Sequence, residues 1–251
     1  MFLGVKAIRP VKAENMSGKI VNGCIYAINH TNGNDFPTVA QIVKHHFYIL
    51  ADFTMKKDIG VNTLNRLNGV IYVDRKNRQS RAKAKDDLIY LLNNNRNVLL
   101  FPEGTWNLSP NLLTLPLNWG IIDLSTVSGK PVQPIIISYT GGKTYCKIGD
   151  PFYPEQDTDK KENINKLREI MATMMWELIE QGGVCHRNQI DKDYYNKWVK
   201  QQLDTYKKLD FEYERSVVIK EYIGVDEVFK HLRYIMPNKS TVFLFSKRNH
   251  D

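Results

Sequence analysis

The chain has 251 residues, of which 42% are hydrophobic and 25% charged, and its formal net charge is +8. This composition excludes an intrinsically disordered chain, and the length suits one large α/β domain with an appendage. No apolar run approaches the roughly 18 residues of a membrane-spanning helix, and the three cysteines have neither disulfide nor zinc spacing, which favours a reducing, cytoplasmic setting without a metal site.

Short apolar runs alternate with amphipathic stretches along the chain. Because strands that alternate with helices form parallel sheets, we predict an α/β fold with a single, largely parallel or mixed sheet flanked by helices. The main domain is expected over residues 1–184, and residues 185–251 are expected to form an accessory, mostly helical C-terminal segment. Strands are predicted at residues 19–28, 47–50, 70–73, 97–101, 132–138 and 145–148, and helices at 37–46, 59–67, 79–93, 116–128 and 163–181.

His30 and Asp35 follow the first predicted strand and are separated by four residues. On one continuous helix, five positions would set the two side chains roughly 140° apart. If His30 lies in a turn and Asp35 at the start of the helix that Pro37 opens, the carboxylate can reach the imidazole. Asp35 would then keep one ring nitrogen protonated and leave the other to accept a proton. The alternative is a buried histidine beside an aspartate that caps the helix, a place that suits Asp35.

Three further segments lie at the ends of predicted strands. Gly69 and Arg75 bracket the strand at 70–73, and Phe101-Pro102-Glu103-Gly104-Thr105 ends the next one. Val132-Gln133-Pro134-Ile135 begins a third. In this order, and together with the His30 segment, they resemble the four motifs of the glycerolipid acyltransferases, most closely those that act on 1-acylglycerol 3-phosphate. The resemblance covers roughly residues 19–181.

The resemblance implies an enzyme of phospholipid biosynthesis that moves a fatty acyl group from an acyl thioester to the hydroxyl of a lysophospholipid. His30 would be the general base and Asp35 its orienting partner. The chemistry needs no covalent intermediate and no cofactor besides the thioester, which would be acyl-coenzyme A or acyl carrier protein. Glu103 would bind a hydroxyl or orient Arg75. The substrate-binding residues that the resemblance implies are Gly69, Arg75, Glu103, Gly104, Thr105 and Pro134.

Two features qualify this reading. Trp106 stands where members of the family often have arginine, so the acceptor stays open: another lysolipid, a polyol phosphate or a glycan is the main alternative. The segment of residues 75–85 has six basic residues and no acidic one, which is typical of a surface that attracts phosphates. We expect a peripheral enzyme on the cytoplasmic side of an anionic membrane. A nucleic-acid-binding module would leave His30, Asp35 and Glu103 without a purpose, and the His30/Asp35 pair also argues against a non-catalytic lipid-binding protein.

Overall fold

The computed structural model describes residues 11, 16–31, 33–53, 67–107, 112–140, 142–182, 193 and 197. The chain divides into two compact units, Met1–Leu209 and Asp210–Asp251, and all the described residues belong to the first. The boundary predicted at residues 184 and 185 lies outside the described residues and stays a prediction. The strands are β1 (Met16–Ser17), β2 (Ile25–Ile28), β3 (Phe47–Asp52), β4 (Val70–Val73), β5 (Asn97–Leu100), β6 (Val132–Thr140) and β7 (Lys143–Ile148), and the helices are α1 (Asp35–Ile42), α3 (Arg78–Asn93), α4 (Gly120–Ser128) and α5 (Lys160–Gly182).

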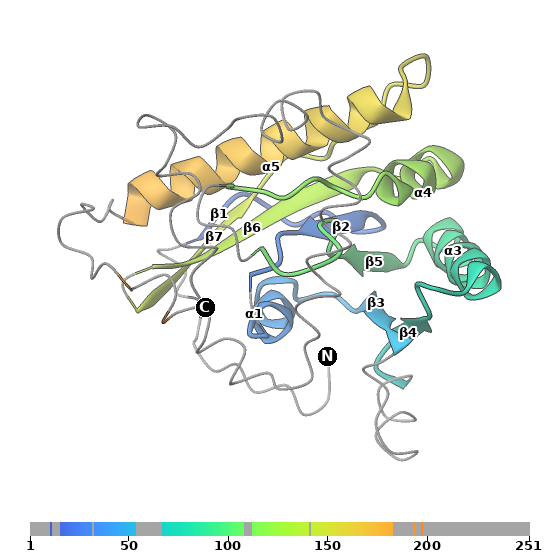
Figure 1. The fold of residues 1–251 in the computed structure, drawn as a ribbon, viewed down its shortest axis with the longest axis horizontal. Coiled ribbons are helices and arrows are strands. Elements are labelled where there is room, and N and C mark those ends of the chain that lie inside the picture. Colours follow the sequence, from blue (N-terminus) through green and yellow to red (C-terminus); the bar gives the residue numbers. More distant parts are fainter. Residues whose placement is uncertain are drawn as a thin grey trace. The chain divides into compact units, whose positions relative to one another are not determined.

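One seven-stranded sheet organises this unit, with the strand order β1-β7-β6-β2-β5-β3-β4 (Figure 1). Every neighbouring pair is parallel except β6 and β7, which form an antiparallel hairpin. The prediction of a single, largely parallel or mixed sheet flanked by helices is therefore confirmed, and the sheet is mixed. The predicted helical C-terminal segment lies outside the described residues.

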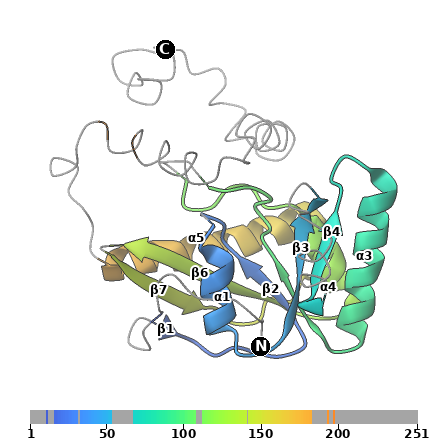
Figure 2. The ribbon, with the colours of Figure 1, turned by 90° about the horizontal axis from the view of Figure 1, so that it is seen from below.

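Helices cover both faces of the sheet. Side chains alternate along each strand, so that Ile25 of β2 packs with α3, α4 and α5, whereas Tyr26 packs with α1. The view in Figure 2 shows α3 running alongside β3 and β4, and Figure 1 shows α1 and α5 on opposite sides of the sheet. Four-residue strands buried on both faces, such as β2 and β5, sit in the middle of this arrangement.

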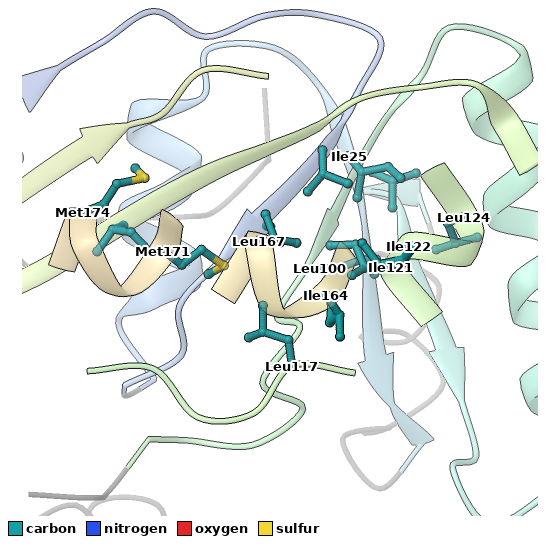
Figure 3. Close-up of a cluster of buried hydrophobic side chains, with 14 of the residues drawn as sticks. Ile25, Leu100, Leu117, Ile121, Ile122, Leu124, Ile164, Leu167, Met171 and Met174 are labelled. Carbon is teal, nitrogen blue, oxygen red and sulfur yellow. The ribbon is translucent and has the colours of Figure 1, made fainter. Parts of the chain in front are cut away.

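The larger core cluster lies under α5, whose apolar residues recur every three or four positions. Figure 3 shows Leu167 and Met171 of this helix directed toward Ile25 and Leu100 of the sheet. Within the described residues, no helix combines the length and the apolar character needed to cross a membrane.

Several predicted boundaries need correction. The first predicted strand is confined to Ile25–Ile28, and the helix predicted at 37–46 begins at Asp35 and ends at Ile42, where Val43 is already extended. The helix predicted at 116–128 begins only at Gly120, because Asn118 donates its main-chain N–H and its side-chain N–H to the carbonyl of Pro102. The short strand β1 had no recognisable pattern, and the helix predicted at 59–67 falls mostly outside the described residues.

Replacing Leu167 by alanine should test the packing of α5. Its side chain is completely buried in the core cluster, so the cavity and the lost burial should reduce the free energy of unfolding by about 2–5 kcal/mol. Urea denaturation measures the change. Ile170, one turn along the same helix and 37% exposed, supplies the control: Ile170→Ala should cost far less, and equal losses in the two variants would contradict the packing described here.

Candidate active site

Four neighbouring parallel strands end at the same edge of the sheet and bring the polar residues together. In their order across the sheet these strands are β2, β5, β3 and β4. His30 follows β2, Glu103 follows β5, Asp52 ends β3 and Arg75 follows β4. The carboxyl ends of parallel strands are where α/β proteins place their sites, and the prediction that His30 and Glu103 both follow such ends is confirmed.

The imidazole of His30 is hydrogen-bonded to Asp35 as the sequence predicted. Its Nδ1 lies 2.9 Å from Oδ2 of Asp35, whose side chain is 1% exposed, while that of His30 is 17% exposed. The main-chain N–H of Thr31 donates to the same Oδ2 at 2.6 Å, and the Thr31 hydroxyl donates to Oδ1 at 3.1 Å. Because a carboxylate only accepts hydrogen bonds, Nδ1 carries the proton, and Nε2 is the nitrogen that can accept one from a substrate.

The expectation that Asp35 caps the helix is wrong. Asp35 is the first residue of α1, and the residue in the capping position is Asn34, which makes no side-chain capping hydrogen bond. The Asp35 carboxylate turns back to Thr31 and His30 instead. The same carboxylate thus binds Thr31 and orients the imidazole of His30.

Two aromatic rings pack against the imidazole of His30. The ring of Phe101 stacks on His30 with centroids 4.1 Å apart and planes inclined by 20°. The indole of Trp106, itself only 8% exposed, meets the imidazole edge to face at 5.9 Å. Trp106 therefore forms a wall of the site, and neither aromatic contact was anticipated from the sequence.

Glu103 is a buried carboxyl that ties two segments together. It is 1% exposed, and it accepts the main-chain N–H of His30 at 3.2 Å and that of Leu115 at 3.0 Å. Burial raises the pKa of Glu103 to about 8, although the two N–H donors and the charge of Arg168 act in the opposite direction. Glu103 thus binds main-chain amides, and Asp52 and the carbonyl of Gly104 orient Arg75.

Arg75 is held by Asp52 and by the loop that carries Glu103. Its Nε lies 2.7 Å from Oδ2 of Asp52, and its Nη1 donates to the carbonyl of Gly104 at 2.6 Å. Gly104 has a φ of +71°, and a Cβ there would lie 2.6 Å from Nδ2 of Asn118. Only glycine suits this position, so the carbonyl that binds Arg75 depends on it. Asp52 was missed because the predicted strand ended at residue 50.

The remaining predicted residues are placed differently. Thr105 is buried in the loop between Gly104 and Trp106. Pro134 is buried inside β6, paired with Ala27 of β2, so it lies within the sheet. Gly69 precedes β4 and hence lies at the opposite edge of the sheet, where its φ of +90° shapes the turn into that strand. The structure therefore does not bring Gly69 to the edge where Arg75 and His30 lie.

Asn29 positions the main chain just before His30. Its side-chain amide donates to the carbonyl of Ile137 at 2.9 Å and accepts the N–H of Ile137 at 2.8 Å. This pair of hydrogen bonds continues the ladder between β2 and β6 beyond the last residue of β2. Among the described residues, no group of three or more histidine, cysteine, aspartate or glutamate side chains is arranged to hold a metal ion.

The pH dependence of stability should reveal the buried Glu103 carboxyl. Its pKa rises from an ordinary 4.5 to about 8 in the folded protein, so between these pH values the folded state keeps a proton that the unfolded state has released. The free energy of unfolding should then fall with rising pH in this window, by at most about 1.4 kcal/mol per pH unit. Glu103→Gln, which has no such proton, should lack this contribution.

Urea denaturation of the wild type and Glu103→Gln at several pH values between 5 and 8.5 tests this. The difference between the two proteins should change with pH in favour of the variant. Glu155→Gln is the control. The hydrogen bond from Lys166 lowers the pKa of this exposed carboxyl, so the titration of Glu155 changes the free energy of unfolding only at more acidic pH. Parallel curves for Glu103→Gln and the wild type would show that the buried carboxyl has an ordinary pKa.

Two known acyltransferases are similar to this chain in sequence or in fold. A 1-acyl-sn-glycerol-3-phosphate acyltransferase of Haemophilus influenzae is 27% identical to this chain over 178 residues, which cover 65% of this chain and 72% of the relative. The crystal structure of the 1-acyl-sn-glycerophosphate (LPA) acyltransferase PlsC from Thermotoga maritima superposes with a TM-score of 0.53 at 23% identity, over 68% of this chain and 73% of that one. The second likeness supports the fold.

The acyltransferase family as a whole matches residues 10–138. This match begins before β1, ends within β6, and includes His30, Asp35, Arg75, Glu103 and Pro134. The resemblance inferred from the four motifs is thereby confirmed: the chain belongs to the acyltransferase family.

Proposed function

We propose that this enzyme transfers a fatty acyl group from an acyl thioester to the free hydroxyl of a lysophospholipid, 1-acylglycerol 3-phosphate, with His30 as the general base and Asp35 as its partner. The observation that carries the proposal is the 2.9 Å hydrogen bond between Nδ1 of His30 and Asp35 at the carboxyl edge of the sheet. The names of the relatives from Haemophilus influenzae and Thermotoga maritima support the choice of acceptor.

The reaction requires only proton transfer and nucleophilic attack. Nε2 of His30 takes the proton of the acceptor hydroxyl as its oxygen attacks the thioester carbon. The resulting tetrahedral intermediate collapses, the carbon–sulfur bond breaks, and the imidazolium returns the proton to the departing thiolate. Asp35 stabilises the imidazolium between these steps, because its carboxylate already accepts the Nδ1 proton. No side chain becomes acylated.

Arg75 would bind the acceptor phosphate beyond the hydroxyl. Its guanidinium is anchored at the edge by Asp52 and by the carbonyl of Gly104, and a guanidinium can offer further N–H groups to phosphate oxygens. Glu103 would act indirectly, by fixing the main chain of His30. We assign Gly69 no contact with the same phosphate, since it precedes β4 and lies at the other edge of the sheet.

A second acceptor class is favoured by one residue. Trp106 places a buried indole against His30, and an indole offers an apolar ring face and no positive charge. The same acyl transfer to another lysolipid, a polyol phosphate or a glycan is therefore the alternative. A panel of these acceptors, each assayed with radiolabelled acyl-coenzyme A and acyl carrier protein as donors, decides between them. No transfer to 1-acylglycerol 3-phosphate in the same assays would refute the first proposal.

We further propose that the enzyme works at the surface of an anionic membrane on the cytoplasmic side. The segment that leads into α3 and the first turn of that helix support this, because Lys76, Arg78 and Arg81 are exposed there. Each basic residue close to an anionic surface contributes about 1 kcal/mol of attraction. Sedimentation with vesicles that contain or lack anionic lipid tests the association.

Replacing His30 by alanine should abolish acyl transfer without unfolding the protein. Loss of a general base lowers kcat by about 100-fold to 10,000-fold. Transfer assays and circular dichroism measure the two properties. His45→Ala is the control, since His45 is exposed after the end of α1 and should leave turnover unchanged. Near-normal turnover in folded His30→Ala would refute the mechanism.

Replacing Arg75 by alanine should mainly weaken binding of a phosphorylated acceptor. The variant loses charge-assisted hydrogen bonds to phosphate, each worth roughly 1.5–3 kcal/mol, so KM should rise by about tenfold or more. Steady-state kinetics with 1-acylglycerol 3-phosphate, and with a monoacylglycerol that has no phosphate, show whether the rise in KM depends on the phosphate. An equal loss with both acceptors would mean that Arg75 supports the loop and does not bind phosphate.

A further inference from the structure

Arg81 reaches from α3 to the main chain of Arg75. It lies in the first turns of the helix, its side chain is exposed, and its Nη1 donates a hydrogen bond to the carbonyl oxygen of Arg75. The side chain is therefore directed back toward the carboxyl edge of the sheet. The guanidinium of Arg81 thus lies at the end of β4, beside the residue whose own guanidinium reaches Gly104.

Basic side chains outnumber acidic ones at this place: Arg75, Lys76, Arg78 and Arg81 against Asp52 and Asp74. The guanidinium of Arg75 is paired with Asp52 at 2.7 Å, so these two charges offset each other. Arg81 takes part in none of the ion pairs found among the described residues. A phosphate monoester carries between one and two negative charges at neutral pH. The Arg75–Asp52 pair alone cannot neutralise it, whereas an additional cation can.

The amides at the start of α3 are not available for this role. The side-chain oxygen of Asn77 already accepts the N–H groups of Gln79 and Ser80, at 2.9 and 3.1 Å. The first turn has no acidic residue, although the positive end of a helix dipole favours acids over bases. Basic side chains in this position repel the dipole, and a bound anion would relieve that repulsion.

We propose that Arg81 is a second cationic ligand of the acceptor phosphate, opposite Arg75. The inference rests on the proposed function and adds to it a residue outside the four motifs. The ligand chemistry is a phosphate monoester, whether it belongs to the head group of the acceptor or to a free phosphate. Arg75, tethered by Asp52 and Gly104, sets the position of the phosphate, and Arg81 supplies the charge that Asp52 removes from Arg75.

The kinetic test uses a short-chain 1-acylglycerol 3-phosphate below its critical micelle concentration, so that no lipid surface is present. Arg81→Ala should raise KM for this acceptor roughly tenfold, with a far smaller change in kcat, and Arg81→Lys should restore much of the loss. Lys83→Ala is the matched control, because Lys83 is on the same helix, 78% exposed, and paired with Asp87. It should leave KM unchanged.

Direct binding separates this inference from the proposed function. Calorimetric titration with glycerol 3-phosphate, and with inorganic phosphate, needs no acyl transfer. Weaker binding by Arg81→Ala than by Lys83→Ala would support the inference even if the enzyme transferred nothing to a lysophospholipid.

Three results would overturn the inference. The first is equal binding and equal KM in Arg81→Ala and the wild type, including the absence of phosphate binding in both. The second is an equal loss with a monoacylglycerol acceptor, which would mean a structural defect. The third is a loss seen only on anionic vesicles, which would make Arg81 a membrane contact.

Discussion

The buried carboxyl of Glu103 is the contact on which the site depends. It joins the main-chain N–H of His30, at the end of β2, to that of Leu115, in the segment before α4. Both amides would otherwise be buried without a partner, and an unsatisfied buried amide costs about 1–3 kcal/mol. The main chain of His30 is fixed from its other side as well, because its carbonyl accepts the N–H of Asn107 at 2.6 Å. The position of the proposed base is thus set by the backbone, and Asp35 has only to orient the ring.

A pKa of about 8 for Glu103 has an electrostatic consequence for this arrangement. Near neutral pH the group carries less than a full negative charge, so Asp35 supplies most of the negative potential near the imidazole. The nearby charge of Asp35 also contributes to the raised pKa of Glu103, since like charges disfavour each other's ionised form. Burial of Glu103 therefore lets one carboxyl serve as a structural acceptor while the other remains the partner of His30.

Much of the fold and part of the site could be predicted from the sequence, because both follow from local patterns. Short apolar runs predicted the strands β2, β4 and β5. Turn residues between His30 and Asp35 indicated that the two side chains meet. The pairing of Arg75 with Asp52 and the contacts of Glu103 with His30 and Leu115 were not predictable in this way. They join residues that lie between 12 and 73 positions apart, and main-chain donors have no signature in the sequence. The prediction that Asp35 caps the helix was wrong because a carboxylate can bind either the amides at a helix start or an imidazole. In this structure it binds the imidazole.

The side chains along the carboxyl edge of the sheet differ between the end of β2 and the end of β4. At β2 the imidazole is enclosed by Phe101 and Trp106, whereas at β4 the groups are guanidinium and carboxylate. Neighbouring strands lie about 4.8 Å apart, so β2 and β4, separated by β5 and β3, are about 14 Å apart. The side chain of Arg75 shortens this separation, because its Nη1 reaches the carbonyl of Gly104, which follows β5 next to β2. A hydroxyl at His30 and a phosphate at Arg75 can therefore belong to one small glycerol phosphate unit. The glycine at 104 is what permits this approach, since any side chain there would collide with Asn118.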